Sequence, residues 1–373
     1  MKLETVIGII MLLALFVGAG LYYRGAPEKG DSTPSGLPLA TTTTVLNSSQ
    51  KAKKYSLAPE LANPSGFINT GGKPITLGEL RGKKVVLLDV WTYSCINCQR
   101  TLPYVTAWYK KYAGEGLEIV GLHTPEFSFE HIKKNVEDAV ARFGITYPVV
   151  LDNDYSTWNA YGNQYWPRKY LIDIDGYIVY DHTGEGNYAE TERAIQTALA
   201  ERKERLAATT TVSADITVPQ NAASFDSSVV GSPEVYFGSA RNEYLSNGLS
   251  ATANRQTLAL PANPELNRLY LGGTWQFMPE YAENQSEARI VFRYQARNVY
   301  MVASSATGVV MEVLQDGKLV GAGSGADVDR GSGTVTIKEE RLYTLIEDGR
   351  AGEHTLELRI KKSGFKVFTF TFG

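Results

Sequence analysis

Cysteine and histidine are scarce in this chain, whose 373 residues include two cysteines and four histidines. Two thiols cannot form a scaffold of several disulfides or a four-cysteine zinc site, so we expect no bound metal. Charge of one sign is also lacking, because 37 Lys and Arg residues face 40 Asp and Glu residues for a formal net charge of −3. This balance gives no electrostatic reason to expect a nucleic-acid partner.

Hydrophobic residues, in contrast, are plentiful enough for compact cores. They make up 43% of the chain, and the aromatic residues comprise 22 Tyr, 13 Phe and 5 Trp. This composition excludes a disordered or fibrous protein. The length corresponds to about two to three domains of ordinary size.

An uncharged apolar run occupies positions 5–22. A helix of this length is just long enough to cross the hydrocarbon core of a membrane. Small residues at positions 18–20 leave open whether the run is cleaved as a signal peptide, and we favour an uncleaved anchor. Residues 1–24 are therefore predicted to be a transmembrane anchor or signal peptide.

Composition divides the rest of the chain into two globular units. Residues 25–55 are rich in Gly, Pro, Ser and Thr, which is typical of a flexible tether. Residues 207–223 are rich in Ala and Thr and are predicted to link the two domains. The predicted globular units are residues 56–206 and 224–373.

The first unit alternates apolar runs with helical patterns. Residues 84–91 and 117–123 are continuous apolar stretches of the kind found in strands buried on both faces, and a helical pattern lies between them. Asp175-Gly176 separates two further short strands and signals a hairpin, and residues 188–205 form an amphipathic pattern. We expect an α/β fold with a βαβ crossover, a terminal hairpin and a final helix.

The second unit has almost no helical pattern. Its predicted strands recur at short intervals, and Asp316-Gly317 is predicted to join two of them as a hairpin. This spacing favours an all-β sandwich of jelly-roll type. The predicted strands are residues 269–277, 289–294, 299–303, 309–314, 334–338, 342–346, 355–360 and 365–372.

Both cysteines fall in one motif, Cys95-Ile96-Asn97-Cys98, where a predicted buried strand ends and a predicted helix begins. The first N–H groups and the dipole of a helix favour an anion, so we expect Cys95 to be a thiolate near neutral pH. Cys98 can then attack a mixed disulfide on Cys95 and release the partner. The alternatives are half of a zinc site, which lacks two further ligands, and an inert structural disulfide, which would close a very short loop.

These residues and their surroundings resemble the thioredoxin family. Asp89 matches the buried acidic residue of thioredoxins, Trp91 the tryptophan at their strand end, and Pro103 the proline of their active-site helix. Pro167 matches the proline that precedes the next strand and is cis in that fold. The resemblance implies a thioredoxin-like fold for residues 56–206 and a redox-active disulfide between Cys95 and Cys98, with no other cofactor.

Longer segments resemble one group within this superfamily, the DipZ-type proteins. The similar segments are residues 91–103, 123–127, 161–167 and the last four residues. In DipZ-type proteins a multi-span membrane electron carrier, related to the cytochrome c biogenesis transporter, precedes the thioredoxin-like domain, and a β-sandwich resembling a carbohydrate-binding module follows it. This chain has one predicted span in place of the carrier, so we expect a separate carrier of the DsbD type to supply its electrons.

Several residues around the motif have candidate roles. Asp89 lies in an apolar run, where burial raises a carboxyl pKa, and could accept the proton of Cys98; an exposed aspartate at the strand edge is the alternative. Glu126 follows the second strand and either supports the thiols or is a solvated loop residue. Trp166 and Pro167 are expected to offer a flat surface and free backbone groups to an extended peptide, unless they form an ordinary strand entry.

Three aromatic residues of the second unit lie on one predicted strand, where residues two positions apart share a face. Tyr270, Trp275 and Phe277 could form a platform for stacking sugars, such as those of a cell-wall polysaccharide, or could equally fill the core. The sequence leaves both interpretations open.

Together these observations predict a membrane-tethered thiol–disulfide oxidoreductase on the extracytoplasmic side of a bacterial cell membrane. Its substrates would be proteins with disulfides, and the resemblance favours reduction over oxidation. Two alternatives remain, an envelope protein that binds glycans and has an accessory redox domain, and a thiol peroxidase of the same superfamily.

Overall fold

The computed structural model describes residues 48–373 except 210, 221 and 223–226. The predicted anchor at residues 5–22 lies outside the described residues, as does the predicted tether up to residue 47. No helix in the described part is both long enough and apolar enough to cross a membrane.

The first domain is built on a six-stranded sheet with the order β1-β4-β3-β2-β5-β6. Strands β2, β3 and β4 run parallel, whereas β1, β5 and β6 are antiparallel to their neighbours. The parallel pair β2 and β3 confirms the predicted βαβ crossover. The strands are β1 (Gly66–Ile68), β2 (Val85–Trp91), β3 (Leu117–His123), β4 (Val149–Leu151), β5 (Arg168–Ile172) and β6 (Ile178–Thr183).

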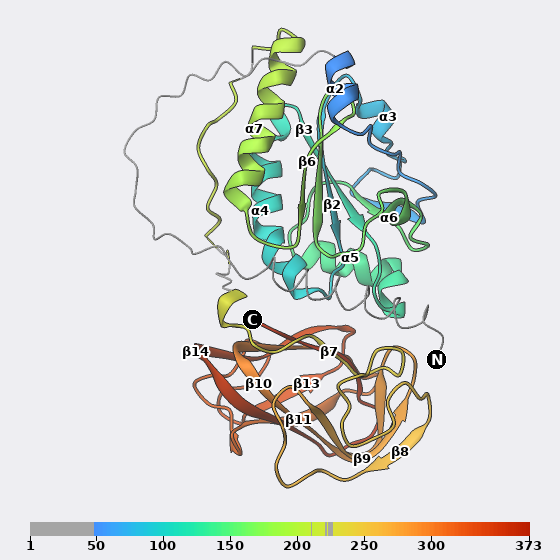
Figure 1. Cartoon of the computed structure of the whole chain (residues 1–373), viewed down its shortest axis with the longest axis vertical. Helices are drawn as coiled ribbons and strands as arrows, with labels where there is room; N and C mark the ends of the chain where they lie inside the picture. Colours follow the sequence, from blue (N-terminus) through green and yellow to red (C-terminus); the bar gives the residue numbers. More distant parts are fainter. Residues whose placement is uncertain (1–47, 210, 221, 223–226) are drawn as a thin grey trace, which may run out of the picture. The chain divides into compact units, whose positions relative to one another are not determined.

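Helices cover both faces of this sheet (Figure 1). One face carries α4 (Ile96–Tyr112), α5 (Lys133–Arg142) and α7 (Tyr188–Arg205), and the other carries α3 (Leu77–Leu80) and α6 (Ser156–Ala160). Two short 3₁₀ helices, η1 (Ala113–Glu115) and η2 (Ser128–His131), follow α4 and β3.

Strand β2 is buried from end to end because both faces of the sheet are covered. Val85 and Leu87 join the core beneath α4, α5 and α7. Leu88 and Val90 join the core beneath α3 and α6. Successive side chains of a strand point to opposite faces, so a strand between two helical layers needs an unbroken apolar run. The apolar pattern read from the sequence therefore located β2 correctly.

The hairpin predicted at Asp175-Gly176 is confirmed. Strands β5 and β6 pair antiparallel on either side of it. Gly176 has φ +90°, a conformation that glycine adopts without strain. The Asp173 carboxylate accepts hydrogen bonds from the N–H groups of Asp175 and Tyr177, which fixes the turn.

The prediction that the flexible tether continues to residue 55 is wrong at its end. A short helix, α2 (Ser48–Lys54), occupies this segment, and its Lys51 side chain is buried. Lys51 bonds to the carboxylates of Asp173 (2.6 Å), Asp175 (2.8 Å) and Glu201. These ion pairs attach the segment to the first domain, an interaction that composition cannot reveal.

The second domain is rich in β-strands, as predicted, and its strands form one hydrogen-bonded network of nine strands. The eight predicted segments fall on six strands, because β10 and β14 each contain two of them and run for 23 and 20 residues. The jelly-roll type stays a prediction. The strands are β7 (Val235–Tyr236), β8 (Arg255–Leu258), β9 (Leu269–Phe277), β10 (Ala282–Ser304), β11 (Val309–Gln315), β12 (Lys318–Leu319), β13 (Thr334–Ile337), β14 (Arg341–Ile360) and β15 (Lys366–Phe372), preceded by η3 (Ser227–Val229).

The predicted hairpin at Asp316-Gly317 is also confirmed. It joins β11 to β12, and both of its residues have positive φ, 53° and 77°. Two positive φ values in a row characterise the turns that match the twist of paired strands.

Candidate active site

The two cysteines lie at the start of α4, immediately beyond the carboxyl end of β2. Cys95 is the N-cap residue of the helix, and its Sγ accepts a hydrogen bond from the Cys98 N–H at 3.4 Å. Both are free thiols in the structure. Cys95 is half-buried, whereas Cys98 is 1% exposed. A substrate disulfide can therefore reach the Cys95 thiol directly. It can reach the Cys98 thiol only after it has reacted with Cys95.

Burial keeps the Cys98 thiol protonated. The surrounding protein raises the pKa of Cys98, and the hydrogen bond and charge of Cys95 and the charge of Asp89 raise it further. A thiol of this kind needs a nearby base before it can act as a nucleophile. The order of reactivity predicted from the sequence, Cys95 before Cys98, agrees with this geometry.

Asp89 has the properties of such a base. It lies on β2, is 1% exposed, and neither of its carboxylate oxygens has a hydrogen-bond partner. Burial raises the pKa of Asp89 to about 6, and the positive charge of Lys169 opposes this rise. The alternative of an exposed aspartate at the strand edge is wrong. Asp89 is ionised for most of the time at neutral pH and can accept one proton.

Lys169, which the sequence analysis did not single out, lies directly opposite Asp89 in the pairing of β2 with β5. Its side chain is fully buried, which lowers the pKa of Lys169. The charges of Asp89 and Cys98 partly reverse this lowering. Asp89, Lys169 and Cys98 therefore form one buried set, in which the pKa of each group is affected by the charge of at least one other.

Two further unpartnered groups lie close to this set. Trp91 is fully buried, and its indole N–H has no hydrogen-bond partner. The hydroxyl of Tyr147 is likewise unpartnered, and the charges of Asp89 and Cys98 add to the effect of burial in raising the pKa of Tyr147. Unsatisfied buried polar groups cost free energy, and they are retained most often at functional sites.

Glu130 holds the loop that precedes the nucleophile. Its Oε1 accepts hydrogen bonds from the N–H and hydroxyl of Ser94, at 3.2 and 2.7 Å. Its Oε2 accepts from the N–H groups of Glu126 and Phe127, at 2.6 and 3.1 Å. One buried carboxylate thus joins the loop before Cys95 to the loop after β3. Nothing in the sequence marked Glu130, because a glutamate in a polar 3₁₀ turn looks like a surface residue.

Glu126 is anchored and is not the solvated loop residue that the sequence left open. Its Oε1 accepts hydrogen bonds from the Tyr236 hydroxyl (2.9 Å) and the Arg241 guanidinium (2.7 Å). Both partners belong to the second domain. Arg241 also lies over the Tyr236 ring, 3.7 Å from its centroid. Neither partner was singled out from the sequence.

A groove of about 350 Å³ lies in front of Cys95 and is lined by both domains. Its lining includes the first residues of the cysteine motif and Tyr165, whose side chain is 54% exposed. The lining residues are Ser94, Cys95, Ile96, Asn97, Glu126, Gln164, Tyr165 and Trp166 from the first domain, and Glu234, Tyr236, Arg241, Val302, Thr369 and Thr371 from the second.

Pro167 follows a cis peptide bond, as the resemblance implied. It is buried, however, and its carbonyl accepts a hydrogen bond from the Gly184 N–H at 2.8 Å. The expectation that Pro167 itself offers a flat surface and free backbone groups is therefore wrong. Trp166 fulfils it instead: its ring lines the groove, and its main-chain N–H and C=O make no hydrogen bond within the described part of the chain.

The aromatic platform proposed for sugar binding is not at the surface. Trp275 and Phe277 are fully buried in the core of the second domain, and Tyr270 is 6% exposed. All three side chains are buried, so none of the rings can stack on a sugar. The alternative, that these residues fill the core, is confirmed for Trp275 and Phe277, whereas Tyr270 is buried outside that core cluster.

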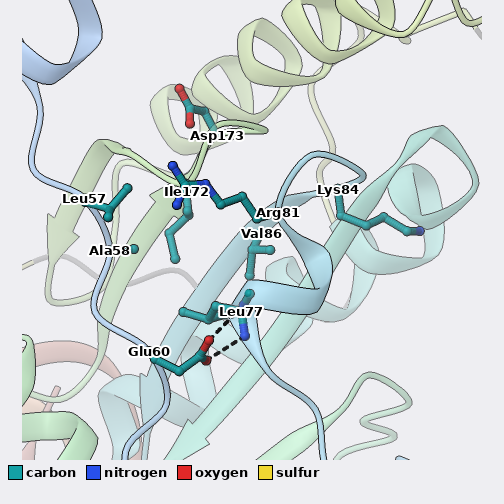
Figure 2. A pocket seen from close by; sticks show the side chains of 11 residues that line it. Leu57, Ala58, Glu60, Leu77, Arg81, Lys84, Val86, Ile172 and Asp173 are labelled. Carbon is teal, nitrogen blue, oxygen red and sulfur yellow. Dashed lines mark hydrogen bonds between the residues drawn. The ribbon is translucent and has the colours of Figure 1, made fainter. Parts of the chain in front are cut away.

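A second cavity lies at the opposite end of the first domain's sheet, near the start of β2 (Figure 2). Figure 2 shows the Glu60 carboxylate at its edge, hydrogen-bonded to the start of α3. The bonds run from the N–H groups of Leu77 and Gly78, at 2.7 and 2.8 Å. Glu60 thus acts as a helix cap at the edge of this cavity of about 100 Å³.

Within the described residues, one cluster of carboxylates has the spacing of a metal site. The ligand atoms of Asp173, Asp175 and Glu201 all lie within 4.8 Å of one another. The ammonium group of Lys51 bonds to all three and occupies the position that a cation would take. The cluster is therefore an internal ion-pair network.

Comparison with known proteins relates both domains to described families. Residues 47–199 match the family model described as Redoxin. Residues 232–373 match the model described as Thioredoxin like C-terminal domain.

Two relatives and one solved structure show how far the similarity extends. Protein DipZ of Mycobacterium tuberculosis is 36% identical over 322 residues, which cover 85% of this chain and 43% of that protein. The chain thus spans less than half the length of this relative. The thiol-disulfide oxidoreductase ResA of Bacillus thuringiensis is 33% identical over 121 residues, 32% of this chain and 66% of that protein. A solved structure of a thioredoxin-like protein in its oxidized form is 26% identical, covers 39% of this chain and 97% of its own, and has a TM-score of 0.37.

Proposed function

Because this chain belongs to the thioredoxin-like family of thiol–disulfide oxidoreductases, we propose that it reduces disulfides in proteins outside the cytoplasm while tethered to the membrane. The observation that carries the proposal is the arrangement of its only two cysteines. Cys95 is accessible at the start of a helix, Cys98 is buried behind it, and Asp89 is buried close enough for its charge to act on Cys98.

The reaction follows from this arrangement in two exchanges. The Cys95 thiolate attacks one sulfur of the substrate disulfide, forms a mixed disulfide and releases the other substrate sulfur as a thiolate. Asp89 then accepts the Cys98 proton, and the Cys98 thiolate attacks Cys95 Sγ. The second substrate thiolate leaves and takes up a proton. Two electrons have passed to the substrate, and Cys95 and Cys98 are joined in a disulfide.

The groove in front of Cys95 suits an extended polypeptide. The free main-chain N–H and C=O of Trp166 can pair with a substrate strand beside the thiol, as one strand pairs with another at a sheet edge. The exposed ring of Tyr165 adds an apolar contact next to them. Proteins with accessible disulfides are therefore the proposed substrates.

The direction of electron flow and the location rest on the resemblance to DipZ-type proteins and on the apolar run at residues 5–22. Reduction of substrates requires a dithiol that reduces the oxidised Cys95/Cys98 pair again, and we propose a membrane thiol carrier of the DsbD type for this step. Residues 5–22 would hold the chain at the extracytoplasmic face of a bacterial membrane. The buried positions of Trp275 and Phe277 give no support to binding of cell-wall polysaccharide.

The potential of the Cys95/Cys98 couple tests this proposal. The full chain is equilibrated with glutathione buffers and, separately, with reduced and oxidised thioredoxin, and the fraction of free thiol is measured. A reductase should have a potential close to that of thioredoxin, well below that of glutathione. A potential above that of glutathione would identify an oxidant and contradict the proposed direction.

A further inference from the structure

Charged groups of both domains line the groove in front of Cys95, and their charges do not cancel. Glu126 and Glu234 both line the groove, whereas Arg241 is the single cation among its lining residues. Arg241 is engaged by Glu126, to which it is bound at 2.7 Å. The surrounding protein and the charge of Glu126 raise the pKa of Glu234 to about 7, so the groove keeps an excess of one negative charge above this pH.

The carboxylate of Glu234 carries this excess. Its Oε1 accepts a hydrogen bond from the Thr371 hydroxyl at 3.2 Å, and no basic side chain of the described residues lies within ion-pair distance of it. The side chain remains accessible to solvent. A carboxylate that is accessible, held by neutral hydroxyl groups and beside the reacting thiol is available to a cation on the substrate.

From this geometry we infer that the groove selects substrate disulfides whose flanking residues are basic, and that Glu234 is the residue that recognises them. The inference rests on the proposed function, because it names the class of protein disulfide that reaches Cys95. It also gives the second domain a specific task in the reaction. The substrate lies between the two domains, its cystine at Cys95 and its lysine or arginine at Glu234.

The neighbours of Glu234 favour a long basic side chain over other cations. Tyr236 and Tyr165 line the same groove, and the aliphatic stem of lysine or arginine packs well on aromatic rings. Thr371 adds a hydroxyl group that can accept a further N–H bond from a guanidinium. An acidic substrate would meet Glu234 without a compensating cation, since Arg241 is bound to Glu126.

The test uses two peptides that each contain the same single disulfide, flanked by lysines in one and by glutamates in the other. Pre-reduced full chain is mixed with each peptide at pH 8, where Glu234 is mostly ionised, and the second-order rate of the first turnover is measured. We expect the lysine peptide to react about threefold to fivefold faster, the effect of one partly exposed ion pair. High salt should reduce this ratio.

Variants assign the preference to one residue. Glu234→Gln should bring the ratio of the two rates close to one, and Glu234→Lys should reverse it. Glu287→Gln, an exposed glutamate of β10 outside the groove, should leave the ratio unchanged. Thermal unfolding of each variant checks that the fold is intact.

Equal rates for the two peptides in the parent chain would overturn this inference, as would a lysine preference that survives Glu234→Gln. Either result leaves the proposed reductase function standing, because both peptides are then reduced. Failure to reduce either peptide would overturn the proposed function and this inference together.

Discussion

Asp89 and Lys169 occupy directly opposite positions on two neighbouring antiparallel strands, and both side chains are buried. Burial disfavours the charge of each, whereas each charge stabilises the other. The result is a carboxylate with a pKa of about 6, next to a thiol that must lose its proton during the reaction. The chemistry of the second exchange step depends on this pair.

The second exchange step should therefore depend on pH. Asp89 can accept a proton only when ionised, so the rate of mixed-disulfide resolution should rise as pH increases through about 6. Asp89→Asn should remove this inflection and slow resolution about 100-fold, the lower end of the range for a general base. Stopped-flow measurement of resolution between pH 5 and 8 gives both quantities. An unchanged profile in Asp89→Asn would exclude Asp89 as the proton acceptor.

The same carboxylate should make the free energy of unfolding depend on pH. The pKa of Asp89 is about 6 in the folded chain, against 3.8 for an unperturbed aspartate. Between these values the folded state binds more protons than the unfolded state, so stability falls as pH rises from about 4 to 6 and the penalty persists above 6.

Asp89→Asn removes this penalty. The variant should gain stability relative to the parent between pH 4 and 8, by up to about 3 kcal/mol for a difference of about two pKa units. The difference in free energy of unfolding between variant and parent is compared at pH 4 and pH 8. The cost of leaving Lys169 without its partner is present at both pH values and cancels in this comparison. Urea unfolding at both pH values measures the gain, and an equal difference at pH 4 and 8 would show that Asp89 titrates normally.

Glu130 should be essential for the position of the nucleophile. Its carboxylate accepts four hydrogen bonds from two loops, and Glu130→Gln replaces one acceptor oxygen with a donor that faces N–H groups. We expect a loss of stability of about 2–4 kcal/mol and a slower reaction of Cys95. The exposed residue Glu137 on α5 is the matched control, and Glu137→Gln should change stability by about 0.5 kcal/mol at most. Equal effects of the two substitutions would show that the bonds of Glu130 are unimportant.

Lys51 should contribute strongly to stability although it comes from a short helix at the edge of the described chain. Burial lowers the pKa of Lys51, but its three carboxylate partners outweigh this effect and raise it. Lys51→Met leaves the buried Asp173 carboxylate without its cation, whereas Arg205 still pairs with Asp175 and Glu201, and should destabilise the fold by about 3–5 kcal/mol. Lys53→Met on the exposed side of α2 should be nearly neutral. Chemical denaturation distinguishes the two, and a neutral Lys51→Met would mean that α2 does not hold to the domain.

The sequence located the parts of the site that depend on local pattern. The apolar run of β2 places Asp89 in the interior, and the strand-to-helix junction places Cys95 at the N-cap. Both follow from periodicity and helix capping, which act over a few residues.

Groups brought together by tertiary structure were beyond the sequence. Lys169 meets Asp89 only because β5 pairs with β2, and Arg241 meets Glu126 across 115 positions of the chain. Trp275 was ambiguous for a related reason, since alternation along a strand marks a shared face without saying whether that face is covered. In the structure, the face that carries Trp275 is covered by the core of the second domain.

The central claim, that Cys95 attacks the substrate and Cys98 resolves the product, is tested most directly by trapping the mixed disulfide. The full chain with Cys98→Ser is incubated with a protein disulfide, and the covalent adduct is identified by mass spectrometry. We predict a stable adduct through Cys95 in this variant, no adduct with Cys95→Ser, and none that persists in the parent chain. An adduct formed equally by Cys95→Ser, through Cys98, would contradict the account.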